Sequence, residues 1–383
     1  MNWIEKMIAE QCPQGVKRIK LGEVCEISTG TKPNTIETTG SYKYINAGTT
    51  ESGYCQCFNT LGDTVTTPSR GQGGIGFVGY QRTNFWCGPL CYRIKAKTPT
   101  FLNRYLYLYL SCHNELILVF KCVGGTPAIN RKDIESIEIP LPPLSIQEKI
   151  VDVLDKFTEL IEKTDEEIAL RQKQYEYYRE KLLTFEEGEA EWMKLGDLFE
   201  FKNGLNKEKK AFGHGTPIVN YTDVYKKRGL KREDVKGLVE LNKSEINRFN
   251  CKKGDVFFTR TSETKEEVGF PSVLLDDIEH CTFSGFVLRA RSLTDLLLPH
   301  YCKYCFFTYY FRQQVIKSAT LTTRALTNGK SLSKITIPVP SPSRQQEIVA
   351  TLDKFESLIA SLKEERELRQ KQYEYYREKL LTF

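Results

Sequence analysis

Two polar loops contain the side chains whose chemistry is easiest to assign. The first loop, residues 66–74, reads TTPSRGQGG, and the second, residues 259–269, reads TRTSETKEEVG. Arginine and glutamine can form paired hydrogen bonds with base edges, whereas serine, threonine and lysine commonly hold phosphates. The two loops therefore indicate contact with DNA. The alternative is that they are ordinary solvated loops, whose polar side chains need no ligand.

The predicted DNA-binding residues lie in these loops and in nearby polar stretches of each half of the chain. Each half has a further polar loop, GGTPAINRKD at 124–133 and TTRALTNGKS at 322–331. The candidates in the first half are Lys32, Thr67, Ser69, Arg70, Gln72 and Thr126. Those in the second half are Lys207, Arg260, Thr261, Ser262, Lys265 and Arg324.

Sequence motifs for catalysis or cofactor binding are weak or missing. Residues 71–76 read GQGGIG, which has dinucleotide-binding spacing, but the following FVGY predicts a strand where such a site requires a helix. The sequence has no G-x-x-x-x-G-K-[ST] loop and no Ser/His/Asp or paired-carboxylate arrangement that spacing supports. Its 12 cysteines and 4 histidines lack zinc-site spacing. We predict a binding protein with no catalytic residues, cofactor or metal of its own.

The same composition predicts a cytoplasmic protein without a membrane partner. Unpaired, scattered cysteines are typical of reduced thiols in the cytosol. The sequence contains no apolar run of membrane-spanning length, and its first residues, MNWIEKMIAE, lack a signal-peptide core.

Charge is unevenly distributed along the chain, which has a net charge of +6. Residues 20–140 carry 12 basic and 9 acidic side chains, and residues 194–338 carry 25 and 16. Residues 141–193 are acidic, with 7 basic and 14 acidic side chains, and residues 339–383 are balanced. Basic parts that alternate with acidic or neutral ones are typical of polyanion-binding modules on a non-binding spacer. Ordinary surface charge could produce the same distribution.

The acidic and neutral parts contain an internal repeat. The sequence LRQKQYEYYREKLLTF occurs at 170–185 and again, unchanged, at 368–383. Residues 140–185 align with 338–383 at an offset of 198, with 30 identities in 46 positions. Such agreement indicates duplication.

Both repeats are predicted to form long helices that pack against each other in antiparallel order. Apolar residues recur at steps of three and four, as along the seam of a coiled coil. Two separate helical linkers are the alternative. We expect Ser145 with Glu148, and Ser343 with Gln346, to cap the helices. The predicted helix-packing residues are Ile150, Val153, Phe157, Leu160, Tyr175, Tyr178, Leu182, Ile348, Phe355, Leu358, Tyr373, Tyr376 and Leu380.

The parts between the helical segments are also related to each other. Lys-Leu-Gly at 20–22 recurs at 194–196, and Gly-Asp at 62–63 recurs at 254–255 before a strand-like stretch. Each part continues through a polar loop and an aromatic, helix-like segment to Ile-x-Ile-Pro. Short strands, polar loops and one helical segment predict a mixed α/β fold (α+β globular domains).

These repeats together predict two globular domains and two long α-helices, related by an internal pseudo-twofold axis. The predicted divisions are a first globular domain at 1–140, a first helical region at 141–190, a second globular domain at 191–338 and a second helical region at 339–383.

This order resembles the specificity subunit of type I DNA restriction-modification enzymes. The resemblance rests on the repeated Lys-Leu-Gly openings, the Gly-Asp strands and the junctions IPLPPLSIQEKI (139–150) and IPVPSPSRQQEI (337–348). It covers essentially the whole chain. It implies that the globular domains are target-recognition domains, each reading one half of a bipartite DNA sequence. It also implies that an antiparallel coiled coil separates these domains, sets the unread spacer and docks methyltransferase subunits.

The resemblance further implies the partners. They are double-stranded DNA, two methylation (M) subunits that use S-adenosylmethionine and, in the full complex, ATP-driven restriction (R) subunits. No cofactor is expected on this chain. Two alternatives remain at this point, namely a methyltransferase or nuclease with unrecognised motifs and a coiled-coil scaffold without DNA specificity. Activity of the chain alone would favour the first, and failure to shift duplex DNA would favour the second.

Overall fold

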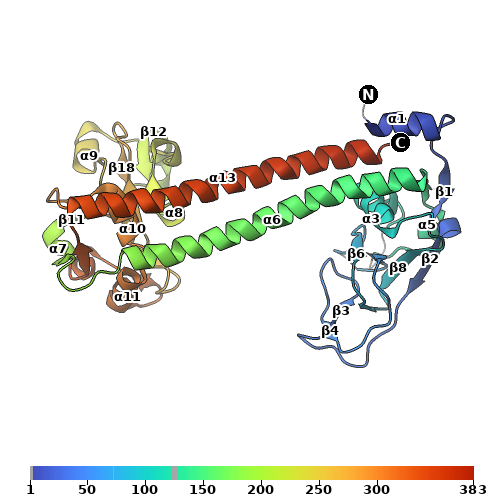
Figure 1. The fold of residues 1–383 in the computed structure, drawn as a ribbon. Coiled ribbons are helices and arrows are strands. Elements are labelled where there is room, and N and C mark those ends of the chain that lie inside the picture. The colour runs from blue at the N-terminus through green and yellow to red at the C-terminus, as the bar shows by residue number, and fades with distance from the viewer. Residues whose placement is uncertain (1–2, 72, 123–126) are drawn as a thin grey trace. The chain divides into compact units, whose positions relative to one another are not determined.

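The computed structural model describes residues 3–71, 73–122 and 127–383, and the chain divides into two compact units. The first unit comprises Met1–Glu166 with Glu364–Phe383, and the second comprises Glu167–Lys363. The long helices α6 (Leu144–Leu182) and α13 (Pro342–Leu381) each contribute residues to both units. Each unit is therefore a globular domain together with a section of both helices (Figure 1).

The first globular domain contains a four-stranded antiparallel sheet in the order β2-β8-β5-β6 and a three-stranded sheet in the order β4-β3-β7. Ile27, Ile94 and Val65 are register partners on adjacent strands of the larger sheet, and all three are buried. Helix α3 adds Tyr105 and Leu106 to the same core. The helices are α1 (Trp3–Gln11), α2 (Leu21–Val24), α3 (Asn103–Cys112), α4 (Glu115–Leu118) and α5 (Arg131–Ser136). The strands are β1 (Arg18–Lys20), β2 (Cys25–Thr29), β3 (Tyr42–Ile45), β4 (Tyr54–Cys55), β5 (Thr64–Pro68), β6 (Gly79–Gln81), β7 (Trp86–Cys87), β8 (Cys91–Ala96) and β9 (Glu138–Pro140).

The second globular domain repeats this topology and adds to it. Its main sheet has the order β11-β19-β15-β17-β13, and the smaller sheet β14-β12-β18 matches β4-β3-β7, including the parallel pair. Strand β13 and the sheet β16-β21-β20 have no counterpart among the named strands of the first domain. The helices are α7 (Leu195–Leu198), α8 (Tyr221–Lys226), α9 (Lys243–Arg248), α10 (Pro299–Cys305), α11 (Tyr309–Ser318) and α12 (Gly329–Leu332), with 3₁₀ turns at Lys209–Ala211 and Arg232–Asp234. The strands are β10 (Glu191–Lys194), β11 (Phe199–Asn203), β12 (Phe212–Val219), β13 (Gly229–Leu230), β14 (Gly237–Val239), β15 (Val256–Thr259), β16 (Thr261–Ser262), β17 (Pro271–Leu274), β18 (Thr282–Phe283), β19 (Val287–Ser292), β20 (Thr320–Leu321), β21 (Ala325–Leu326) and β22 (Thr336–Val339).

A buried glutamine joins each globular domain to the long helix that follows it. In the first unit, Gln147 accepts a hydrogen bond from Leu102 N (2.9 Å) and donates to Thr100 O (3.1 Å) and Pro142 O (2.8 Å). Its side chain is fully buried. Because all its polar atoms have backbone partners, this glutamine fixes where the helix leaves the domain.

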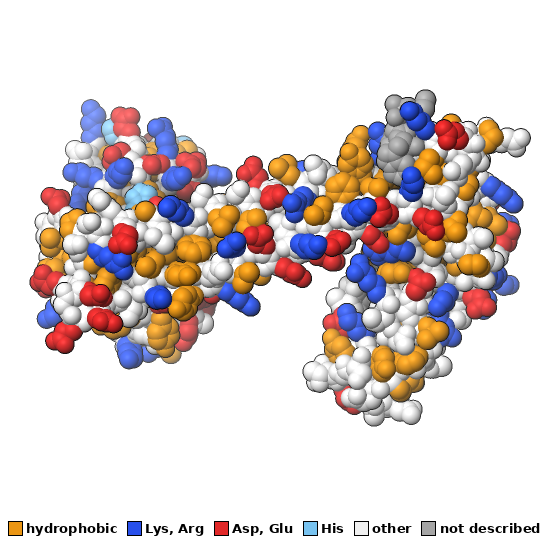
Figure 2. Space-filling view, viewed as in Figure 1, with side chains coloured by type: hydrophobic (Ala, Val, Ile, Leu, Met, Phe, Trp, Pro, Cys, Tyr) orange, Lys and Arg blue, Asp and Glu red, His pale blue; other side chains and the backbone are white. Residues whose placement is uncertain are grey.

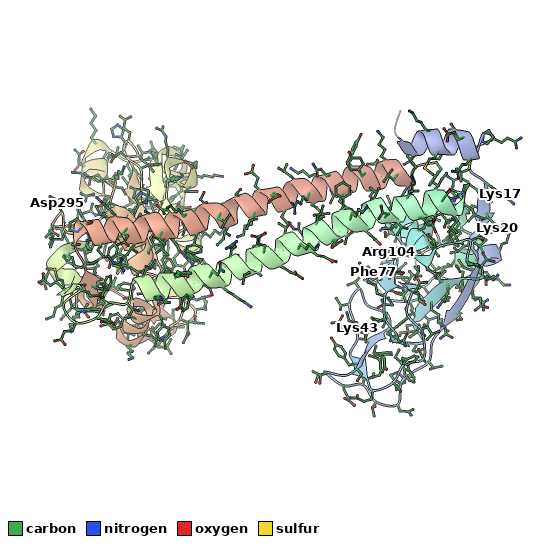
Figure 3. All side chains as sticks on the ribbon, in the orientation of Figure 1. Lys17, Lys20, Lys43, Phe77, Arg104 and Asp295 are labelled. Carbon is green, nitrogen blue, oxygen red and sulfur yellow. The ribbon has the colours of Figure 1, made fainter. Side chains whose placement is uncertain are left out.

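The second unit contains the same junction. Gln345, 198 positions later, accepts from Leu298 N (2.9 Å) and donates to Leu296 O (2.7 Å) and Pro340 O (2.9 Å). An ion pair accompanies each junction. It links Arg104 and Asp155 at 2.6 Å in the first unit, where Arg104 lies beside α6 (Figure 3), and Lys303 and Asp353 at 3.3 Å in the second.

Sections of α6 and α13 pack against each other within each unit, and the contacts are equivalent. In the first unit Phe157 of α6 stacks on Tyr376 of α13, with ring centroids 5.3 Å apart and an interplanar angle of 22°. In the second unit Phe355 of α13 stacks on Tyr178 of α6 at 5.4 Å and 24°. Adding the offset of 198 converts Phe157 into Phe355 and Tyr178 into Tyr376. The same contact therefore forms twice with the two helices exchanged, as in an isologous interface.

Of the predicted helix-packing residues, Phe157, Tyr178, Phe355 and Tyr376 form these stacked pairs, whereas the side chains of Leu160 and Leu358 are exposed. Leu160 is 43% exposed and Leu358 40% exposed, whereas the next residues, Ile161 and Ile359, are buried. The isoleucines are therefore the more buried residues of the apolar stripe at these positions. An α-helix has 3.6 residues per turn, so a stripe of apolar residues that repeats every 3.5 residues slowly rotates around it. The next buried position therefore lies four residues further along the helix here, not three. The predicted residues found buried or packed against a core are Ile150, Val153, Tyr175, Leu182, Ile348, Phe355, Tyr373 and Leu380.

The predicted caps of the two helices are wrong by a few residues. Helix α13 begins at Pro342, and Ser341 Oγ accepts a hydrogen bond from Arg344 N at 3.3 Å. Proline favours the first helical position. Ser343 therefore lies in the first turn of the helix and not at its cap. Ser145 likewise lies inside α6, and its hydroxyl donates to Gln11 Oε1 at 2.9 Å.

Candidate nucleic-acid interface

The described candidates of the first domain lie at one end of the sheet β2-β8-β5-β6. Strands β2 and β5 end there and β8 begins there, because neighbouring strands are antiparallel. Lys32 follows β2, and Ser69 and Arg70 follow β5. Ser69 N donates to Leu90 O at 2.9 Å, and Ile129 N donates to Ser69 O at 3.0 Å. These hydrogen bonds bring the polar loop after β5 next to the loop before α5.

The second domain gathers its candidates at the equivalent end of its main sheet. Strands β11 and β15 end there and β19 begins there. Arg260 N donates to Phe286 O at 3.1 Å, and Thr327 N donates to Arg260 O at 2.9 Å. This is the backbone pattern that surrounds Ser69 in the first domain. Arg260 and Phe286 therefore occupy the positions that Ser69 and Leu90 hold in the first domain.

The other candidates of the second domain border the same end of the sheet. Thr261 forms β16, which pairs with β21, and β21 pairs with β20 in a hairpin whose turn carries Arg324. Lys207 follows Leu205, which forms a parallel bridge with Ser284. Lys265 lies in the loop between β16 and β17 and is partly exposed. The structure thus brings together residues separated by more than 100 positions in the sequence.

The Arg260 side chain already forms one hydrogen bond within its own domain. Nη1 donates to Gly285 O at 2.8 Å, and Nε is buried without a hydrogen-bond partner. The guanidinium group has five N–H donors, so other donors remain for a ligand. Arg260 therefore both supports the turn at Gly285 and can offer hydrogen bonds outward.

Two other cations of this interface form surface ion pairs. Lys207 Nζ lies 2.7 Å from Glu245 Oε1, and Arg324 Nη2 lies 3.2 Å from Glu263 Oε1. The hydrogen bond from Lys207 lowers the pKa of Glu245. Exposed pairs of this kind stabilise a protein by at most about 1 kcal/mol, so a DNA phosphate can replace the glutamate as partner.

Three predicted contacts are contradicted by burial. Thr67 lies inside β5 with its side chain fully buried, and Ser69 and Ser262 are buried as well. Ser262 Oγ donates to Glu267 Oε2 at 3.1 Å. Small hydroxyl side chains fit the packed faces of strands, and this explains why polar residue type alone misassigned them. The predicted candidates Gln72 and Thr126 lie outside the described residues.

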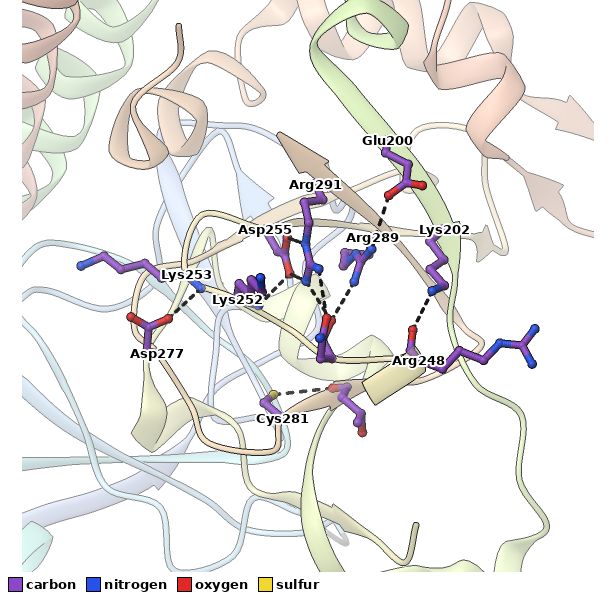
Figure 4. Close-up of polar contacts among 12 residues, drawn as sticks. Glu200, Lys202, Arg248, Lys252, Lys253, Asp255, Asp277, Cys281, Arg289 and Arg291 are labelled. Carbon is purple, nitrogen blue, oxygen red and sulfur yellow. Dashed lines mark hydrogen bonds and ion pairs between the residues drawn. The ribbon is translucent and has the colours of Figure 1, made fainter. Parts of the chain in front are cut away.

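The opposite end of the second sheet holds a charged cluster that secures the Gly-Asp turn (Figure 4). Arg291 binds Asp255 through two hydrogen bonds, Nε to Oδ1 at 2.8 Å and Nη2 to Oδ2 at 2.7 Å, and Lys252 N donates to Asp255 Oδ2 at 2.8 Å. The hydrogen bond with Asp255 raises the pKa of Arg291. In the first domain Asp63 accepts hydrogen bonds from Tyr80 and Asn103 instead. The repeated aspartate thus has a structural partner in both domains.

Sequence reasoning did not single out two further cations on the second sheet. Lys202 Nζ donates to Arg248 O at 2.6 Å, and Arg289 Nη1 donates to Asn250 O at 2.7 Å. Burial lowers the pKa of both side chains. Their backbone partners indicate a structural role. Alternation of polar and apolar residues along β19 marks Arg289 in advance, whereas Lys202 lies on β11.

Surface charge alone does not mark the interface. Figure 2 shows basic and acidic side chains interspersed over the visible surfaces of the units. Within the described residues, no group of three or more His, Cys, Asp and Glu side chains is placed to hold a metal ion. No helix among them is both long and apolar enough to span a bilayer. The interface is therefore defined by strand ends and loop contacts.

Comparison with known proteins identifies the family. The family model of the type I restriction modification DNA specificity domain matches residues 13–170 and 187–369. The chain belongs to this family, and it carries the domain twice.

Individual relatives agree with this assignment. The chain is 32% identical over 268 residues to the EcoR124I/EcoR124II specificity subunit of Escherichia coli, an alignment that covers 65% of this chain and 63% of that subunit. It is 26% identical to a putative type I specificity subunit of Mycoplasma pneumoniae, over 96% of this chain and 98% of the relative. The crystal structure of a type I restriction-modification S subunit from M. genitalium has the same fold, with a TM-score of 0.61, 18% identity and 96% coverage of both chains.

Proposed function

We propose that this chain is the DNA-recognition subunit of a type I restriction-modification complex, and that each globular domain reads one half of a bipartite sequence. The observation that carries the proposal is the pair of equivalent sheet ends with different chemistry. The first domain places Ser69 and Leu90 where the second places Arg260 and Phe286. A shared framework with different side chains at one position suits two domains that read different bases.

The long helices act as the spacer between the two half-sites. Their equivalent contacts, Phe157 with Tyr376 and Phe355 with Tyr178, support an antiparallel coiled coil with an internal pseudo-twofold axis. The length of unread DNA then follows the length of the helices, which is about 60 Å for 39 residues.

Two methylation subunits bind the repeated surfaces of the helices. Exposed apolar residues occur in matching pairs, Leu170 with Leu368 at 54% exposure each and Tyr177 with Tyr375 at 60% and 58%. A surface that is present twice offers the same docking site twice. Restriction subunits complete the assembly. In this proposal S-adenosylmethionine and ATP bind to the partners, and the chain itself catalyses no reaction.

A selection experiment tests the proposed function. The full chain, produced together with its methylation subunits, is incubated with random-sequence duplexes, and the bound duplexes are recovered and sequenced. The proposal predicts enrichment of two short sequences separated by a constant gap. Enrichment of a single continuous sequence, or none at all, would contradict it. Methyl transfer or cleavage by the chain alone would instead indicate an enzyme.

A further inference from the structure

The turn that connects β18 to β19 is held on several sides by backbone hydrogen bonds. Ser284 N donates to Val219 O (3.0 Å), Gly285 N to Leu205 O (2.7 Å) and Val287 N to Ser284 O (3.1 Å). A Cβ atom at position 285 would lie 1.9 Å from Asn206 Oδ1 and 3.1 Å from Leu205 O, so a larger residue would require the Asn206 side chain to move. The backbone around Phe286 is therefore fixed without any contribution from its side chain.

Arg260 completes this support. Its backbone N donates to Phe286 O at 3.1 Å, and its guanidinium Nη1 donates to Gly285 O at 2.8 Å. One residue thus binds two successive carbonyl groups of the turn. This arrangement gives Arg260 a positioning role in addition to any contact of its own.

The Phe286 side chain, in contrast, is 66% exposed at the tip of this fixed turn. Covering an exposed phenylalanine removes apolar surface from water and so favours binding, and a rigid backbone lowers the entropy cost of using it as a contact. The residue at the equivalent position of the first domain, Leu90, is aliphatic and partly buried. The exposed ring is therefore a property of the second domain and not of the shared framework.

The surroundings of Phe286 favour DNA as the group that covers it. The ring projects from the sheet end that also carries Lys207, Arg260 and the Arg324 hairpin. An exposed apolar ring beside cationic side chains is the arrangement of proteins that insert an apolar wedge at a base step while cations hold the flanking phosphates. The β20-β21 hairpin also exposes Leu321 and Leu326, but the cations at this end of the sheet favour a polyanion as the partner.

We propose that Phe286 is an apolar wedge that inserts at a base step of the half-site read by the second domain, and that Arg260 is the positioning residue that holds its turn. The inference rests on the proposed DNA-recognition function. Insertion makes recognition depend on how easily that step unstacks, which adds sequence preference without a hydrogen bond to either base. Flexible pyrimidine–purine steps are the expected targets.

The test uses the full chain with its methylation subunits and duplexes that carry the bipartite sequence found by methylation mapping. 2-Aminopurine is placed in turn at the adenine positions of the second half-site and of the base pairs that flank it. The wild-type complex should raise its fluorescence at one step, because unstacking relieves quenching. Phe286→Ala should abolish this rise and weaken binding about tenfold or more, whereas Phe286→Trp should retain both.

Leu293→Ala is the matched control. Leu293 is 60% exposed and lies just beyond the other end of β19, so its loss should leave both readouts unchanged. If Phe286→Ala leaves fluorescence and affinity unchanged while the wild type binds specific sequences, the wedge is refuted and the proposed function still stands. Loss of a methylation subunit from the Phe286→Ala complex would overturn it in favour of a protein contact. Failure of the wild type to prefer any sequence would overturn both.

Discussion

At the scale of single residues, the two domains carry different side chains at a position where their backbones form the same hydrogen bonds. The backbone position after the central strand is held by the same hydrogen bonds in both, yet it carries Ser69 in one domain and Arg260 in the other. Ser69 is buried, and Arg260 is partly exposed beside Phe286. In the first domain the neighbouring Arg70 is the exposed cation. Each domain thus presents an arginine, but from successive positions of the loop.

Replacing Arg260 by alanine should weaken binding of the assembled complex to DNA. We expect a loss of about 1–3 kcal/mol if the side chain reads a base, limited to duplexes with an intact second half-site. Titration of labelled duplexes with either half-site scrambled measures this. Lys253→Ala is the control, because it removes an exposed cation at the opposite end of the sheet. An equal loss on every duplex would make Arg260 a phosphate contact, and no loss would remove it from the interface.

The buried junction glutamines should be essential to the stability of each unit. Gln345→Leu leaves Leu298 N, Leu296 O and Pro340 O without their partner. Each buried polar group left unpaired costs about 1–3 kcal/mol, so the free energy of unfolding should fall by at least that amount. Chemical denaturation followed by circular dichroism measures the change. Gln346→Leu, at the exposed neighbouring position, should be close to neutral. Equal stability of the two variants would refute the role of the junction.

At the scale of elements, the sequence predicted the duplicated framework better than the residues that line the interface. The 198-residue offset identified both long helices, and the aromatic segments became α3 and α10. Register was less predictable, because the shift of the seam from Leu160 to Ile161 depends on the drift of a stripe around the helix. Thr67 and Ser69 were misassigned since residue type does not reveal that β5 is buried at every position and that the residue after it is buried too. Phe286 was missed because exposure of an aromatic ring depends on contacts between segments far apart in sequence.

The paired aromatic contacts of the helices allow a quantitative test of the repeat. A double-mutant cycle on Phe157 and Tyr376 should give a coupling energy of about 0.5–1.5 kcal/mol in thermal unfolding. The cycle on Phe355 and Tyr178 should give the same value, because both pairs have nearly the same geometry. A coupling near zero in either cycle would show that the stacked rings do not hold the helices together.

At the scale of the whole molecule, the repeat predicts how many partners one chain binds. Leu170 and Tyr177 recur as Leu368 and Tyr375 with nearly the same exposure, so both copies of the surface should bind one methylation subunit. Native mass spectrometry at saturating partner should show two copies per chain. Replacing Leu170 and Tyr177 with serine should leave one copy. A single copy on the wild-type chain would contradict the repeated docking surface.

The spacer role of the helices can be tested by lengthening both of them. Seven helical residues inserted after Thr164, and seven at the equivalent position after Leu362, lengthen both helices by about 10 Å and keep the seam nearly in phase. Since B-DNA rises about 3.4 Å per base pair, the unread gap should grow by about three base pairs. The loops that read the bases are untouched, so both half-sites should remain the same.

The measurement is a map of methylated bases in the genome of a host that carries the chain and its methylation subunits, in wild-type and lengthened form. We expect a bipartite motif for the wild type, and the same two half-sites about three base pairs further apart for the lengthened chain. A continuous motif in the wild type, or an unchanged gap in an active lengthened chain, would contradict this expectation.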